Sequence, residues 1–284
     1  IKMTINAIQV CVITGATSGI GKATAIQLAR LNLELVLIGR NSTKLEYTKQ
    51  VITKKTGNEN IHLFLADLSS QKDIIKVSSN IKKKYTYIDI LINNAGAIVL
   101  THKKSIDGIE LTFALNHLSY FLLTSCLLDL LKLKNHARII NVSSIAHRSA
   151  IIDFNDIQNE KKYKPFKAYG QSKLANILFT YSLAKQLYGT GITVNAIHPG
   201  LISSNLIRNN NPGLGGRFLA YMHHLIGKRP EIAANAITHL ASSPDLINIS
   251  GKYFEGSIQI PSSEYSYNQD IWQKLWNIST NFTK

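Results

Sequence analysis

The sequence is short of acidic residues, with 17 Asp and Glu against 32 Lys and Arg, so its formal net charge is +15. Such an excess fits either a solvated basic surface or a nucleic-acid-binding face. Many of the lysines between positions 44 and 84 fall on expected outer helices. We therefore expect a solvated surface and no nucleic-acid partner, with attraction to anionic membranes left open. A nucleic-acid-binding protein would instead show salt-sensitive affinity for DNA or RNA.

Cysteine is scarce as well, since Cys11 and Cys126 are the only two. Cys11 lies within an expected buried strand, which argues against a disulfide framework. The sequence contains neither a Cys-x-x-Cys nor a His-Glu-x-x-His motif, so we expect no metal site.

Long apolar runs are also missing. The longest, Leu118–Leu131, is interrupted by Asp129 and is shorter than the ~20 residues that a membrane span needs. It is expected to be a buried or interface helix. No signal peptide is visible, and only residues 1–8 precede the first expected strand. We expect a cytoplasmic protein without a transmembrane segment, whose membrane association is at most peripheral.

What the sequence does contain is a regular alternation of apolar β-branched runs and helical patterns. The alternation predicts one Rossmann domain over residues 1–284, with a doubly wound parallel sheet of about seven strands and helices on both faces. Ligands of such sheets bind at the carboxyl ends of the strands. The expected strands cover residues 9–14, 34–38, 61–66, 88–92, 138–142, 193–197 and 252–254, and the helices 20–31, 43–55, 73–84, 108–131, 168–187 and 230–240.

A glycine-rich motif, TGATSGIG at residues 14–21, joins the first strand to the first helix. Gly15, Gly19 and Gly21 leave room for a tight turn and for a pyrophosphate close to the backbone. The helix N-terminus adds free N–H groups and partial positive charge. The motif predicts a dinucleotide site, the alternative being a turn that only packs helix on strand.

The residues at the ends of the next expected strands indicate which dinucleotide binds. A carboxylate at the end of the second strand would bind the ribose of NAD, but Gly39-Arg40 stands there, and arginine pairs with phosphate. We therefore expect NADP(H). Asp67 follows the third strand and suits the adenine amino group, while Asn94-Ala95-Gly96 after the fourth lets backbone approach the adenosine.

Tyr169 and Lys173 are four residues apart on an expected helix and so share one face. A cation near a phenol favours the phenolate and lowers the pKa of the phenol from its usual value near ~10. Ser143 and Ser144 end the fifth strand, where alternation would point the two hydroxyl groups apart.

These motifs occur in one order along the chain, and together they resemble the short-chain dehydrogenase/reductase family. The resemblance rests on TGATSGIG, Asn93-Asn94-Ala95-Gly96, Asn116, Ser144, Tyr169-x-x-x-Lys173 and Pro199-Gly200. Within the family the chain is most similar to the retinol dehydrogenase group, through residues 115–124, 141–147, 172–179 and 250–254. The Asn- and Gly-rich segment at about 203–228 departs from that group.

The resemblance implies roles for the site residues. Tyr169 would be the general acid or base, Lys173 would lower the Tyr169 pKa and hold the ribose, and Ser144 would bind the substrate oxygen. Asn116 would position Lys173 through a water. A catalytic histidine at 117, 147 or 198 is not expected. The implied cofactor residues are Gly15, Thr17, Ser18, Gly19, Ile20, Gly21, Arg40, Asp67, Leu68, Asn94, Ala95, Gly96, Tyr169, Lys173, Pro199, Gly200, Ile202 and Ser204.

The expected function is NADP(H)-dependent hydride transfer to or from an apolar aldehyde, ketone or alcohol, with retinal or retinol as examples. The segment at about 203–228 would select the substrate. The alternative is a non-catalytic NADP-binding protein with the same fold. The resemblance also implies a homodimer or homotetramer, formed through the helices at 108–131 and 168–187.

Overall fold

Side chains of the first strand, β1 (Val10–Thr14), alternate between two separate cores in the computed structural model, which describes residues 8–200 and 229–284. Val10 and Val12 belong to the core on one face of the sheet, and Cys11 and Ile13 to the core on the other. Strands buried on both faces are typical of parallel sheets covered by helices.

The sheet has eight strands in the order β3-β2-β1-β4-β5-β6-β7-β8, one more than expected. The first seven pair in parallel, and β8 joins antiparallel after a tight turn at Gly256. The order reverses between β1 and β4, which places a ligand crevice beyond their carboxyl ends. The remaining strands are β2 (Glu34–Gly39), β3 (Ile61–Leu65), β4 (Ile90–Asn93), β5 (Arg138–Val142), β6 (Thr193–His198), β7 (Lys252–Glu255) and β8 (Ile258–Ile260).

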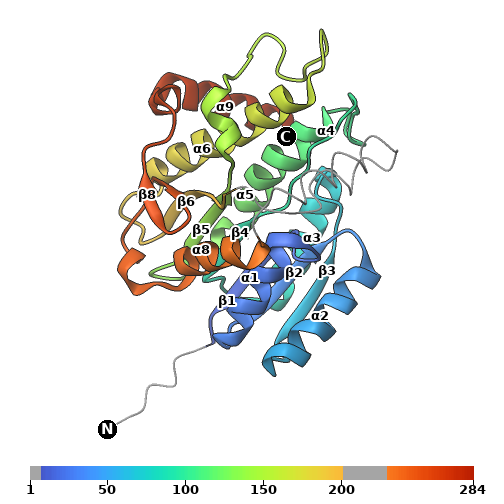
Figure 1. The fold of residues 1–284 in the computed structure, drawn as a ribbon, viewed down its shortest axis with the longest axis vertical. Helices are drawn as coiled ribbons and strands as arrows, with labels where there is room; N and C mark the ends of the chain where they lie inside the picture. Colours follow the sequence, from blue (N-terminus) through green and yellow to red (C-terminus); the bar gives the residue numbers. More distant parts are fainter. Residues whose placement is uncertain (1–7, 201–228) are drawn as a thin grey trace.

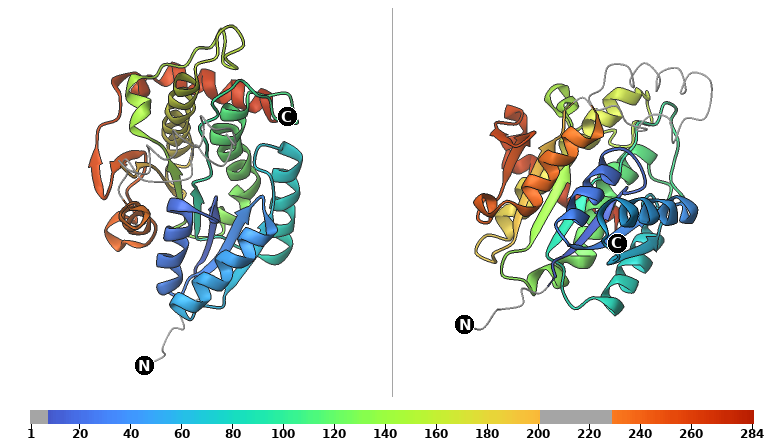
Figure 2. Two further views of the ribbon diagram at one scale, coloured as in Figure 1. Left: turned by 45° about the vertical axis from the view of Figure 1, so that its right-hand side comes forward. Right: turned by 60° about the horizontal axis from the view of Figure 1, so that its bottom comes forward.

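Helices cover both faces of this sheet (Figure 1, Figure 2). One layer is formed by α1 (Gly19–Arg30), α2 (Ser42–Thr56) and α8 (Pro230–Ser242), the other by α3 (Gln71–Lys84), α5 (Ser119–Lys132) and α6 (Pro165–Gln186). The expected doubly wound α/β fold is confirmed, with boundaries that differ by a few residues.

The helix expected at 108–131 is interrupted. It starts as α4 (Leu111–Phe113), passes through a π-helical turn (Ala114–Leu118) and continues as α5. Residues 111–132 are long and apolar enough to cross a membrane, but 72% of their most apolar window is buried within the fold. They form a core helix that packs against α3. Single-turn π segments are rare and occur often at functional sites.

A C-terminal helix that the sequence interpretation missed, α9 (Gln269–Phe282), lies along α6. Trp276 stacks on Phe179 with ring centroids 5.9 Å apart, and Trp272 lies 5.7 Å from Tyr181. Residues 168–183 of α6 are all buried within the single chain. The chain's own α9 therefore covers part of α6, and the expected subunit interface through α6 stays a prediction.

Candidate functional site

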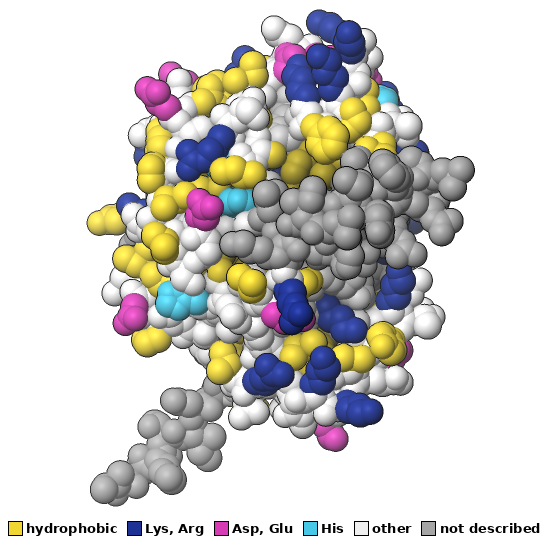
Figure 3. Space-filling view, viewed as in Figure 1, with side chains coloured by type: hydrophobic (Ala, Val, Ile, Leu, Met, Phe, Trp, Pro, Cys, Tyr) yellow, Lys and Arg dark blue, Asp and Glu magenta, His cyan; other side chains and the backbone are white. Residues whose placement is uncertain are grey.

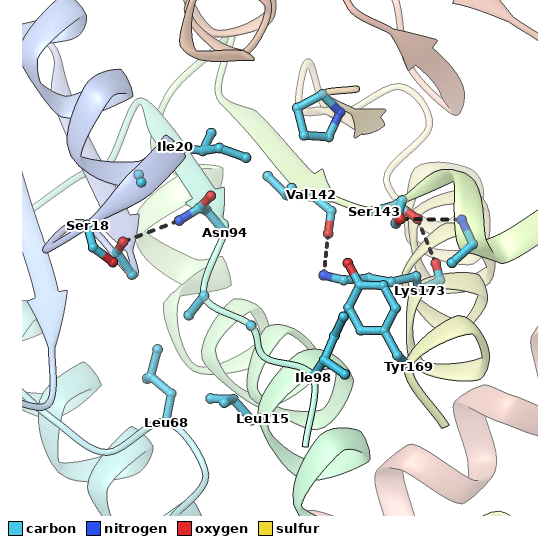
Figure 4. Close-up of a pocket in the computed structure, with 18 of the residues that line it drawn as sticks. Ser18, Ile20, Leu68, Asn94, Ile98, Leu115, Val142, Ser143, Tyr169 and Lys173 are labelled. Carbon is cyan, nitrogen blue, oxygen red and sulfur yellow. Dashed lines mark hydrogen bonds between the residues drawn. The ribbon is translucent and has the colours of Figure 1, made fainter. Parts of the chain in front are cut away.

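A cleft of about 470 Å³ opens at the carboxyl ends of the strands, beside the switch point between β1 and β4 (Figure 4). This volume lies in the usual range for small-molecule sites. All of the expected cofactor residues that the structure describes line it: Gly15, Thr17, Ser18, Gly19, Ile20, Gly21, Arg40, Asp67, Leu68, Asn94, Ala95, Gly96, Tyr169, Lys173, Pro199 and Gly200. Ile202, Ser204 and the segment at about 203–228 lie outside the described residues.

The glycine-rich turn leaves its backbone open to the cleft. Gly15 has φ +67°, and a Cβ on it would lie 2.9 Å from the Cα of Ala95. A Cβ on Gly21 would collide with the Gly15 carbonyl oxygen. Ser18, the N-cap of α1, makes no side-chain bond to the first turn, so the first N–H groups of that helix can serve an anion. These features fit a dinucleotide pyrophosphate.

Asn94 holds the two switch-point strands together. Its Nδ2 donates to the Thr14 carbonyl at 2.8 Å, and Thr14 Oγ1 accepts from the backbone N–H groups of Asn94 and Ala95 at 2.8 and 2.9 Å. Because both the side-chain amide and the backbone N–H of Asn94 bond to Thr14, Asn94 shapes the crevice by fixing the two strand ends at its floor. Asp67 Oδ1 accepts from both N–H and hydroxyl of Ser69, at 2.9 and 2.7 Å, and its carboxylate lines the cleft.

Arg40 marks the outer end of the cleft, where β2 stops. Gly39 precedes it, and a Cβ there would lie 3.1 Å from Thr17 Cγ2, so the close approach of β2 to the glycine-rich turn favours glycine. Arg40 is exposed and lines the cleft. On the face shown in Figure 3, Lys and Arg side chains are spread over several elements and outnumber Asp and Glu.

Tyr169 and Lys173 meet at the inner end, both on α6 (Figure 4). Lys173 is 3% exposed, its Nζ donates to the Val142 carbonyl at 3.0 Å, and burial lowers its pKa to about 7. Burial raises the pKa of Tyr169 to about 12, against a smaller lowering by a hydrogen bond with the Ser144 hydroxyl. The Tyr169 pKa thus lies above its usual value and not below it, as was expected from the neighbouring Lys173, whose Nζ lies 5.7 Å from the ring centroid.

The two serines at the end of β5 have different partners. Ser143 Oγ is buried and donates to the Lys173 carbonyl at 2.8 Å, so it fastens α6 to the strand end. Ser144 Oγ accepts from the Ala146 N–H at 3.3 Å and bonds to the Tyr169 hydroxyl. Ser144 is therefore the serine whose hydroxyl bonds to Tyr169 in the cleft.

Asn116 lies behind the cleft in the π-helical turn and is fully buried. Its Oδ1 accepts from the Ala97 N–H at 2.8 Å, and its Nδ2 donates to the Ala97 carbonyl at 2.9 Å and to Ser172 Oγ at 3.0 Å. A Cβ on Gly96 would lie 3.2 Å from Asn116 Oδ1 and 3.4 Å from Lys173 Nζ, so glycine leaves room for both side chains against its backbone.

An apolar section of the cleft beside Tyr169 was not foreseen. Ile98 and Tyr169 form a small cluster with Leu100 and Ala146. Phe166 is 58% exposed at the rim. Most of these residues come from loops and helix starts, so no periodic pattern marks them. The lining residues missed on this side are Ile98, Leu115, Val142, Ser143, Ile145, Ala146, Ser149, Phe166 and His198.

The histidines near the motifs are buried or partly buried and bond to neighbouring backbone or side-chain groups. His147 Nε2 accepts from the Ser263 N–H at 3.2 Å, and its Nδ1 lies 2.7 Å from the Ser144 carbonyl. Burial lowers the pKa of His117 and of His147 to about 4 and also lowers that of His198. His198 lines the cleft, with its Nδ1 accepting from the Gly200 N–H at 3.4 Å.

A family model described as short chain dehydrogenase matches residues 9–215. Human retinol dehydrogenase 13 is 40% identical over 269 residues, covering 93% of this chain and 81% of that protein. Human polyprenol dehydrogenase is 34% identical over 283 residues, covering 97% and 85%. The solved structure of the Pseudomonas aeruginosa RhlG/NADP active-site complex aligns with a TM-score of 0.68 at 25% identity, covering 91% of this chain and 96% of that one.

Proposed function

Because the chain belongs to the short chain dehydrogenase family, and is therefore an oxidoreductase that uses a nicotinamide cofactor, we propose that it transfers hydride between NADP(H) and an apolar aldehyde, ketone or alcohol. One observation carries the proposal. Ser144, Tyr169 and Lys173 converge at one end of a cleft whose other end is the glycine-rich turn. The residues that would hold the dinucleotide and those that would move a proton therefore share one cavity.

The residues can fill complementary roles in this reaction. The bound nicotinamide would supply or accept the hydride. A Tyr169 pKa of about 12 keeps the phenol protonated at neutral pH, so it can donate to a substrate oxygen as negative charge develops there. Ser144 can donate a second hydrogen bond to the same oxygen. Lys173 lies where its side chain can bind the ribose of the cofactor. Because the Lys173 pKa is about 7, this side chain can gain or lose its charge near neutral pH.

The preference for NADP(H) rests on Arg40 at the end of β2, and the related Pseudomonas protein binds NADP. We expect Arg40→Ala to lower the ratio of kcat/KM for NADPH over NADH by about 10- to 100-fold, because a charge-assisted bond to a phosphate contributes ~1.5–3 kcal/mol. Steady-state kinetics with both cofactors measure the ratio. Arg30→Ala, at the exposed end of α1, is the matched control. Equal efficiency of the unaltered enzyme with NADH and NADPH would reject the preference.

The apolar substrate class rests on the lining near Tyr169, where Ile98, Leu115 and Phe166 face the cleft. Relatives named for retinol and for polyprenol point to the same class, isoprenoid alcohols or aldehydes. The test measures NADPH oxidation at 340 nm with a panel of polar and apolar carbonyl compounds. Faster turnover of long apolar aldehydes than of short polar ones is expected. NADPH binding with no turnover across the panel would favour the non-catalytic alternative.

The oligomeric state and cellular location stay predictions. A homodimer or homotetramer requires a surface other than the covered face of α6, or displacement of α9. A basic surface is compatible with a cytoplasmic protein that contacts anionic membranes at their surface.

A further inference from the structure

The C-terminal helix reaches the catalytic layer through one buried histidine. His117 is fully buried in the π-helical turn, directly after Asn116. Its Nε2 lies 2.9 Å from Ser279 Oγ on α9, and its Nδ1 lies 3.2 Å from Asn176 Oδ1 on α6. Ser279 is also fully buried. One imidazole thus joins three helical segments that are far apart in the sequence.

The direction of these hydrogen bonds follows from Asn176. Its Nδ2 donates to the Asn116 carbonyl at 2.9 Å, so its Oδ1 is the atom facing His117 and has to accept. Nδ1 of His117 therefore carries the ring proton, and Nε2 accepts from the Ser279 hydroxyl. Burial, which lowers the pKa of His117 to about 4, keeps the ring neutral and hence in this single tautomer at neutral pH.

The path of hydrogen bonds that starts at His117 ends at the backbone carbonyl of Tyr169. The Asn116 side chain accepts from the Ala97 N–H and donates to the Ala97 carbonyl. It also donates to Ser172 Oγ, and Ser172 Oγ in turn donates to the Tyr169 carbonyl at 2.7 Å. A displaced Asn116 would therefore disturb the loop after β4 and the first turns of α6 together. No residue of this path except Tyr169 lines the cleft.

We propose that His117 is a positioning residue, which, with Ser279 of α9, holds the π-helical turn so that Asn116 stays locked to Ala97 and α6. His117 touches neither the cleft nor the reacting atoms, so it acts through Asn116. The C-terminal helix α9 then helps to position Asn116 and the start of α6, in addition to covering α6. The activity readout of this inference rests on the proposed carbonyl reduction.

The first test compares His117→Leu, which fills the space without polar atoms, with His117→Gln, whose amide can still donate to Asn176. We expect His117→Leu to lower kcat by about 10- to 100-fold, the scale of a small misplacement of catalytic groups, with KM for NADPH within about threefold. His117→Gln should restore most of the loss. Unchanged kcat in His117→Leu, or equal losses in both variants, would overturn the proposal.

A milder variant keeps the test valid if His117→Leu does not fold. Ser279→Ala removes only the hydroxyl that donates to Nε2, and a several-fold drop in kcat is expected. Its matched control is Ser78→Ala, which removes a buried hydroxyl that donates to the Ile74 carbonyl within α3 and bonds to Cys126 of α5, outside this path. A drop in the control as large as in Ser279→Ala would contradict the positioning role.

Hydrogen exchange supplies a readout that needs no substrate. The Ala97 amide donates to Asn116 Oδ1, so its exchange should accelerate in Ser279→Ala relative to both Ser78→Ala and the unaltered protein. Unchanged exchange at Ala97 would count against the inference. If the unaltered protein reduces no carbonyl compound, the proposed function fails, while exchange at Ala97 still decides the positioning role.

Discussion

Tyr169→Phe is expected to lower NADPH-dependent carbonyl reduction by about 10²- to 10⁴-fold, the usual contribution of a positioned proton donor. The phenol is the group that Ser144 bonds to, and phenylalanine keeps the ring while removing the proton. Because the ring still packs against Ile98, the cleft should keep its shape. Steady-state kinetics of NADPH oxidation with an aldehyde from the panel measure the loss of activity.

The cofactor provides the control for that variant. The NADPH dissociation constant, from fluorescence titration, should stay within about threefold of the unaltered value, because Gly15, Ser18 and Arg40 remain in place. Tyr85→Phe serves as the matched variant, since it removes a tyrosine hydroxyl that donates to Glu34 at 2.9 Å, outside the cleft. Turnover by Tyr169→Phe within a few-fold of the unaltered enzyme would reject Tyr169 as the proton donor.

Lys173→Met should abolish activity and yet stabilise the protein at neutral pH. Lys173 is 3% exposed and its folded-state pKa is about 7, well below the ~10.4 of an unfolded lysine. The unfolded chain therefore binds more protons between these values, so stability rises with pH across that window. Below pH 7 the buried lysine costs the fold on the order of 4 kcal/mol, less the hydrogen bond to the Val142 carbonyl.

Denaturant unfolding from pH 6 to 10 tests whether the free energy of unfolding rises with pH. The variant should be the more stable protein at pH 6, and its advantage should shrink as the pH rises from 7 toward 10, because the folded lysine is then neutral while the unfolded lysine approaches its own pKa of ~10.4. Lys54→Met, an exposed lysine on α2, should give a curve parallel to that of the unaltered protein. An advantage for Lys173→Met that does not change with pH would show that the lysine is not destabilised by burial.

Local backbone requirements explain why the cofactor end could be predicted from the sequence. The glycine-rich turn needs glycine at Gly15 because of its positive φ and at Gly21 because of a close backbone approach. Such requirements depend on neighbours within the motif and so leave a short, readable signature. The alternation of strands and helices was readable for a similar reason, since the face on which each residue is buried follows from its position in the repeat.

Some of the features that were missed depend on long-range contacts. The π-helical turn is held by bonds from Asn116 to Ala97 and Ser172, which no local pattern records. The spacing of Tyr169 and Lys173 predicts a neighbouring cation, but the degree of burial that sets both pKa values comes from the whole fold. The short β8 gives too little periodicity to be recognised. For α9 the signal was present, because Asn268 caps a segment with apolar residues every three or four positions.

The packing of α9 on α6 has a consequence for how the protein is made. The glycine-rich turn is complete once the first strands and helices have emerged, whereas α6 gains its cover only when residues 269–282 have left the ribosome. The two halves of the cleft therefore mature at different times during synthesis. A chain that stops before α9 would keep the dinucleotide turn and expose the apolar side of the helix that carries Tyr169 and Lys173. The cover of α6 by α9 is therefore a contact made within one polypeptide.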